Sequence, residues 1–99
     1  MIEEKSLNVE KTVLVGIINS RQDVIQSKEY LDELAFLAFT AGGEVMNRFT
    51  QKIDFPNPKT FIGSGKMQEV LDYVKENDVS SVIFDDELTP AQQGNIEKY

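Results

Sequence analysis

Cysteine and histidine are both absent from this sequence of 99 residues. Without cysteine the chain has no disulfide, no thiol nucleophile and no thiolate metal ligand. Without histidine it lacks the commonest general base and the commonest metal ligand in proteins, so Ser–His and Cys–His catalysis are excluded within the chain. We therefore expect a domain without a catalytic residue, a metal site or a resident cofactor of its own.

Long apolar runs are also missing. No run approaches the roughly 20 apolar residues that a membrane-spanning helix needs, and the stretch from Met1 to Lys11 has no signal-peptide core. The hydrophobic fraction is 40%, and the apolar residues fall in blocks, which is typical of a globular domain. We expect a cytoplasmic protein in which residues 1–11 form a flexible lead-in and residues 12–99 form one small domain.

Positive charge is scarce, and the formal net charge is −7. An acidic domain usually repels the phosphates of nucleic acids. The segment 48–66 departs from this acidic composition. It holds one acid, Asp54, and four basic residues: Arg48, Lys52, Lys59 and Lys66. Charge variation of this kind is common on solvated surfaces, so by itself it predicts no partner.

Three apolar segments predict the strands of the domain. Residues 12–18 and 81–85 are continuous apolar blocks, which is typical of strands buried on both faces of a parallel sheet. Residues 44–53 have a more polar pattern, as expected of an edge strand. We therefore place 12–18 between the other two strands.

Three helices are predicted between and after these strands. We expect the first to have Ser27 as its N-cap and to end at Gly42–Gly43, and the second to run from near Lys66 to Asn77–Asp78. The third begins at Thr89–Pro90, with threonine as N-cap and proline at the first helical position, and reaches Tyr99. The order β-α-β-α-β-α predicts an α/β fold, a small three-layer open parallel sheet with right-handed crossovers.

The glycine-rich turn Gly63-Ser64-Gly65-Lys66 is the most tempting ligand motif, because it opens a helix and ends in lysine. A Walker A loop requires glycine where Thr60 stands and serine or threonine where Met67 stands, so the motif fails at two fixed positions. We interpret the segment as a tight turn. Its four residues remain candidates for a weak anion site only.

The carboxyl ends of parallel strands are where open α/β sheets bind ligands. Three segments should meet there: Asn19-Ser20-Arg21, Pro56 to Lys66, and Asp85 to Thr89. Within the last of these, Asp85-Asp86-Glu87 is a run of carboxylates, which we interpret as solvated loop acids. The sequence leaves four candidate partner contacts, three basic residues and one aromatic residue that falls opposite the core stripe of its helix: Arg21, Lys59, Lys66 and Phe36.

Two long stretches carry a family resemblance: Phe61-Ile62-Gly63-Ser64-Gly65-Lys66-Met67-Gln68-Glu69-Val70, and the residues from Val82 to Glu97 with Asp85-Asp86-Glu87-Leu88-Thr89-Pro90 at their centre. The sequence from about Thr12 to Tyr99 resembles the N-terminal domain of HflX-type GTP-binding proteins. The resemblance implies a cytoplasmic GTPase that binds the large ribosomal subunit, both rRNA and protein, and separates stalled or idle ribosomes. In that family the α/β unit is followed by a pair of long helices and then by the GTPase domain, so GTP and Mg²⁺ would be bound outside these residues.

The resemblance also implies one further strand after the last helix, which this sequence does not contain. Strand 81–85 should then be an open edge, and we expect either self-association of the fragment at that edge or fraying of the last helix. Three functions remain open at this point. They are a ribosome-contacting regulatory module, an independent nucleotide- or anion-binding domain that uses Gly63 to Lys66, and a scaffold that positions the helical pair.

Overall fold

A three-stranded parallel sheet forms the centre of the protein. In this computed structural model, which describes residues 9–98, the strand order is β2-β1-β3. The strands are β1 (Glu10–Ile18), β2 (Gly43–Lys52) and β3 (Ser81–Phe84). The predicted parallel sheet, with the continuous apolar strand in the middle, is therefore confirmed.

Strand β1 begins two residues before the predicted Thr12. Glu10 pairs with Gly43 of β2, and the backbone oxygen of Lys11 accepts a hydrogen bond from the Ser80 N–H at 2.8 Å. Glu10 and Lys11 therefore belong to β1 rather than to a flexible lead-in. The predicted lead-in otherwise falls on residues 1–8, which lie outside the described residues.

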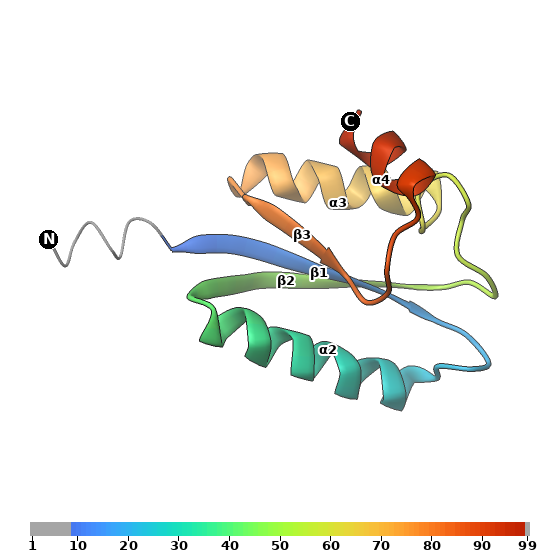
Figure 1. Ribbon diagram of the computed structural model, residues 1–99, viewed down its shortest axis with the longest axis horizontal. Coiled ribbons are helices and arrows are strands. Elements are labelled where there is room, and N and C mark those ends of the chain that lie inside the picture. The colour runs from blue at the N-terminus through green and yellow to red at the C-terminus, as the bar shows by residue number, and fades with distance from the viewer. Residues whose placement is uncertain (1–8, 99) are drawn as a thin grey trace, which may run out of the picture.

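Helices cover both faces of the sheet, which gives three layers (Figure 1). Helix α2 (Val24–Thr40) lies on one face, and α3 (Ser64–Glu76) and α4 (Pro90–Glu97) lie on the other. Thr89 caps α4 as predicted, since its side chain accepts from the Gln92 N–H and Pro90 is the first helical residue. The predicted end of this helix, Tyr99, lies outside the described residues.

The starts of α2 and α3 differ from the prediction. The N-cap of α2 is Asp23, which forms a capping box with Gln26, whereas Ser27 is buried inside the helix. Helix α3 begins at Ser64 with Gly63 as N-cap, two residues earlier than predicted, because the Gly63 oxygen already accepts from the Met67 N–H at 2.8 Å. Both helices are therefore longer at their amino ends than the sequence pattern indicated.

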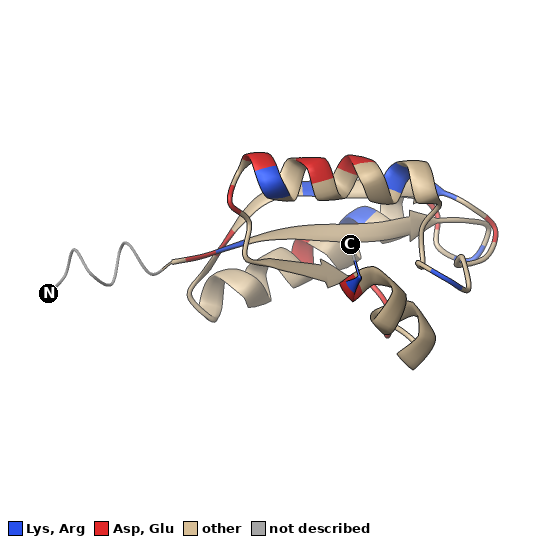
Figure 2. Ribbon diagram, turned by 90° about the horizontal axis from the view of Figure 1, so that it is seen from above, with Lys and Arg blue, Asp and Glu red and all other residues tan. Residues whose placement is uncertain are grey.

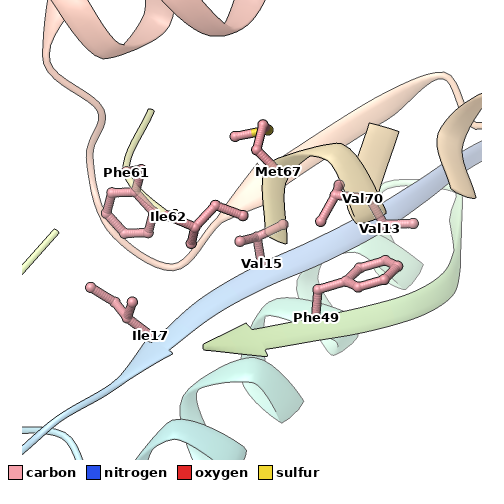
Figure 3. Close-up of a cluster of buried hydrophobic side chains, with 8 residues drawn as sticks. All are labelled: Val13, Val15, Ile17, Phe49, Phe61, Ile62, Met67 and Val70. Atoms are coloured by element: carbon pink, nitrogen blue, oxygen red, sulfur yellow. The ribbon is translucent and has the colours of Figure 1, made fainter. Parts of the chain in front are cut away.

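The hydrophobic core lies between the sheet and α3, as Figure 3 shows. It is built from alternate residues of β1 together with apolar residues of β2, of α3 and of the segment before α3: Val13, Val15, Ile17, Phe49, Phe61, Ile62, Met67 and Val70. On the opposite face, Leu14 and Leu31 are buried between the sheet and α2. Strand β1 is thus buried on both faces, as a continuous apolar run predicts.

A tight loop before α3 carries a buried aromatic residue in an unusual backbone conformation. Phe61 has φ +69° and is paired with Asn57 through two backbone hydrogen bonds of 2.8 Å. The side chain of Gln92 in α4 donates to the Asn57 backbone oxygen at 2.7 Å. This loop therefore links the core, through Phe61, to α4, through Gln92.

Candidate functional site

A cavity of about 390 Å³ lies where the three parallel strands end. Residues that follow β1, β2 and β3 line it together, among them Arg21, Pro56 and Asp85. The loops that contribute these residues gather at the arrowhead end of the sheet (Figure 1). The expected meeting of the three carboxyl-terminal segments is therefore confirmed.

Asp85 is a buried acid in the wall of this cavity. Only 5% of its surface is exposed, and its Oδ2 accepts hydrogen bonds from the Ile17 N–H at 3.2 Å and from Gln22 Nε2 at 2.8 Å. Its other oxygen, Oδ1, is buried and has no hydrogen-bond partner among residues 9–98. A buried acceptor left without a donor is unusual, because it loses its hydration without compensation.

The interpretation of Asp85 as a solvated loop acid was wrong. Its backbone N–H donates to the Val15 oxygen at 2.8 Å, so the residue continues the pairing of β3 with β1. Its side chain accepts a hydrogen bond from the backbone of β1 at Ile17. Asp86 and Glu87, which lie beyond this pairing, are exposed as expected.

The loop after β1 holds Gln22 against Asp85. The side chain of Asn19 accepts from the N–H groups of Arg21 and Gln22, both at 2.9 Å. Besides its bond to Asp85, Gln22 Nε2 donates to the Ile17 oxygen at 3.0 Å. The carboxylate of Asp85 therefore belongs to a hydrogen-bond network that the loop after β1 holds in place.

Gly16 makes room for the carboxylate. A Cβ built on Gly16 would lie 2.9 Å from Asp85 Oδ2 and 3.4 Å from Leu31 Cδ1. The first distance is too short for any real pair of such atoms, so the glycine of β1 is required by the close approach of Asp85. Asp85, Gly16 and Gln22 thus form one structural unit.

Burial raises the pKa of Asp85 above its ordinary value of 3.8, and the negative charge of Asp86 acts in the same direction. The hydrogen bonds from Gln22 and Ile17 lower the pKa and offset only part of this rise. The folded protein therefore holds the Asp85 proton more tightly than the unfolded chain does. It follows that this group lowers stability as the pH rises through its folded pKa.

We expect Asp85→Asn to stabilise the fold near neutral pH by about 1 kcal/mol, since it removes a buried charge and keeps an oxygen acceptor. The gain should shrink as the pH falls through the raised folded pKa of Asp85 toward 3.8, because the folded wild-type carboxyl takes up its proton above its ordinary pKa of 3.8. Urea unfolding of both proteins across this pH range checks the prediction. Asp72→Asn, at an exposed position of α3, is the matched charge control and should show no such pH-dependent gain. If the gain of Asp85→Asn persisted unchanged at low pH, the burial of a charged Asp85 would not be its cause.

The predicted anion turn at the start of α3 is only partly available. The Gly63 N–H donates to Gln51 Oε1 at 2.7 Å, so one amide of the turn is already used. Lys66 lies 3.4 Å from the carboxylate of Glu69 and 5.9 Å from the centroid of the Phe49 ring. Charged residues of both signs lie along α3 (Figure 2), so this helix does not present a basic surface.

The four candidate partner contacts do not form one site. Arg21 lines the cavity around Asp85, whereas Lys59 lines a separate cavity of about 440 Å³ together with Lys98. Phe36 lies on α2 and is 64% exposed, in agreement with the prediction that it points away from the core. Within residues 9–98 no group of three acidic side chains is placed to hold a metal ion, and no helix is both long and apolar enough to cross a membrane.

Sequence reasoning missed Gln22, Tyr30 and Phe55, which also line the cavity. Gln22 and Phe55 are ordinary loop residues in the sequence, and Tyr30 looks like a helix-surface residue. Gly16 did carry a signal, because an isolated glycine inside an apolar strand indicates close approach of another group. That signal identifies a crowded position but not the carboxylate that occupies it.

The sheet order and the cavity at its carboxyl edge define an open parallel α/β domain. Comparison with known sequences defines its family. The family model described as "GTP-binding GTPase N-terminal" matches residues 28–99. The chain belongs to the family of N-terminal domains of HflX-type GTP-binding proteins.

Several curated relatives named GTPase HflX are similar over nearly the whole chain. The protein of Flavobacterium psychrophilum is 58% identical over 98 residues, which are 99% of this chain and 24% of the relative. That of Caldanaerobacter subterraneus subsp. tengcongensis is 41% identical over 96 residues, 97% of this chain and 22% of the relative. That of Escherichia coli is 37% identical over 89 residues, 90% of this chain and 20% of the relative. The chain thus spans less than a quarter of the length of these relatives.

Proposed function

We propose that this chain is the non-catalytic N-terminal module of a cytoplasmic, ribosome-associated HflX-type GTPase. In this proposal the module contacts rRNA and protein of the large ribosomal subunit and supports or regulates a GTPase domain that binds GTP and Mg²⁺ elsewhere in the protein. The family match carries the proposal, because it covers almost all of the chain but less than a quarter of relatives that are named GTPases.

The structure around the glycine-rich turn supports a role without GTP chemistry. Met67 occupies the position where a phosphate-binding loop needs a hydroxyl for magnesium, and it is buried in the core with 1% of its surface exposed. Thr60, at the position of the first required glycine, donates its hydroxyl to the Ile62 oxygen at 2.7 Å. Both residues are engaged in packing or in the local backbone, which supports a role without phosphate binding of the Walker type.

Ribosome co-sedimentation tests the module. The longer GTPase should sediment with large subunits about tenfold more weakly when this domain is removed, which corresponds to 1.4 kcal/mol of binding free energy. GTP hydrolysis without ribosomes should persist, because the catalytic groups would lie in another domain. Unchanged sedimentation after removal would reject ribosome contact by this domain and favour the scaffold role.

A second function is an independent nucleotide- or anion-binding domain centred on Gly63, Ser64, Gly65 and Lys66. One observation favours it: Ser64 and Gly65 are exposed at the amino end of a helix of 13 residues, and no atom lies within 4 Å of a Cβ built on Gly65. We expect a calorimetric titration of the chain with GTP to show no binding, because the motif lacks its magnesium and phosphate residues. Micromolar affinity would replace the first function by this one.

A further inference from the structure

The buried carboxylate of Asp85 has one oxygen that receives no hydrogen bond from the described part of the chain. Ile17 and Gln22 both donate to Oδ2, and Oδ1 has no partner within the part of the chain that the structure describes. Asp85 lines the cavity at the carboxyl end of the sheet. An acceptor that is buried, fixed in position and unpartnered points to a ligand that brings a hydrogen-bond donor.

The charge around the cavity selects the kind of donor. Asp54, Asp85 and Asp86 line it, and Arg21 is the one basic residue among the described residues of its wall. This balance repels phosphates and carboxylates and attracts a cation. A metal ion does not fit, because no three acidic side chains of residues 9–98 are grouped closely enough to coordinate it.

Aromatic residues complete the wall. Tyr30 of α2 and Phe55 of the segment after β2 both line the cavity, with 41% and 76% of their surfaces exposed. Rings beside carboxylates are the usual surroundings of bound ammonium and guanidinium groups, because ring faces attract cations and carboxylates accept their N–H bonds. A volume of about 390 Å³ is in the range of cavities that hold small molecules.

We propose that the cavity at the carboxyl ends of β1, β2 and β3 binds an organic cation, a guanidinium or ammonium group, with the carboxylate of Asp85 as the main acceptor. Tyr30 and Phe55 bound the apolar part of the group, and Asp54 and Asp86 attract it from the rim. Gln22 acts as a positioning residue, because it holds Asp85 through a 2.8 Å hydrogen bond. The proposal stands on this cavity alone and does not depend on ribosome binding.

NMR titration of the chain with ethylguanidinium and with ethylammonium tests the proposal. We expect saturable shifts of the amide signals of Gln22, Tyr30 and Asp85 in the wild-type protein. Asp85→Asn should weaken binding at least about tenfold, since a charge-assisted hydrogen bond is lost, while Asp72→Asn, with the same change in net charge on exposed α3, should bind as the wild type does. Tyr30→Leu, which removes an aromatic ring from a half-exposed position, should weaken binding about twofold to fivefold.

Two sources of the cation are distinguished by repeating the titration on the longer GTPase of the proposed function. If the longer protein no longer binds the probes that the isolated chain binds, an arginine or lysine side chain from elsewhere in that protein fills the cavity. If both bind alike, the ligand is a free small molecule. Shifts that do not saturate in the isolated chain, or that are the same in Asp85→Asn, would overturn the proposal.

Discussion

Replacing Phe61 by alanine is expected to lower the free energy of unfolding by about 3–5 kcal/mol, the range for losing a large aromatic side chain from a core. The Phe61 side chain is 99% buried and meets the ring of Phe84 edge to face, with the ring centroids 5.4 Å apart. It belongs to the core that joins the loop before α3 to the sheet (Figure 3). A domain of this size has about 5–15 kcal/mol of stability in all, so the variant should be close to unfolding.

The backbone conformation of Phe61 gives this prediction a sharper form. At φ +69° a residue with a Cβ is strained, so Phe61→Gly should be as stable as Phe61→Ala or about 1 kcal/mol more stable. In ordinary extended backbone the order would be reversed. Phe36→Ala is the control, since Phe36 is 64% exposed and its loss should change stability by less than about 0.5 kcal/mol. Urea unfolding of the four proteins measures these differences, and an alanine variant clearly more stable than the glycine variant would contradict the strained conformation.

The order of strands could be predicted because burial on two faces and burial on one face leave different sequence patterns. Residues 12–18 are continuously apolar and form the central strand, whereas 44–53 are mixed and form an edge. Strand 81–85 is also continuously apolar, yet within residues 9–98 it pairs with β1 alone. Its apolar pattern predicts burial on both faces, but Val82 to Phe84 are only half-buried.

Helix starts were predicted less well, because capping residues are common in loops. Ser27 and Asp23 are both residue types that cap helices, so residue type alone does not choose between them. Ser27 is a buried residue inside α2, so it is not the N-cap of this helix. The pair Asp23 and Gln26 did match the capping-box spacing and was the better signal in the sequence.

The site could be placed but not described. The parallel order of the strands was enough to bring Arg21, Pro56 and Asp85 to one edge. The burial of Asp85 could not be inferred from a run of acids, since it depends on a contact with Gln22, which is 63 residues away in the sequence. A run of acidic residues is usually solvated, so the pattern of charge does not reveal that one carboxylate of the run is buried.

The closest test of this contact is Gly16→Ala, which we expect to destabilise the fold by about 1–3 kcal/mol, the range for overpacking a tight interior. The new methyl group would lie 2.9 Å from Asp85 Oδ2 and 3.4 Å from Asp85 Cγ. The carboxylate cannot easily move away, because Ile17 and Gln22 hold the same oxygen. Relief of the clash would therefore break those hydrogen bonds and leave buried polar groups without partners.

A double-mutant cycle separates this clash from a general intolerance of alanine in β1. With Asp85→Ala in the background the obstructing oxygen is gone, so Gly16→Ala should be less destabilising than in the wild type by at least about 1 kcal/mol. Gly65→Ala is the matched control: no atom lies within 4 Å of its built Cβ, and alanine favours helices, so it should be neutral or stabilise by about 0.5–1 kcal/mol. Urea unfolding measures the loss of unfolding free energy caused by Gly16→Ala in each background. Equal losses would show that the Asp85 carboxylate does not crowd Gly16 of β1.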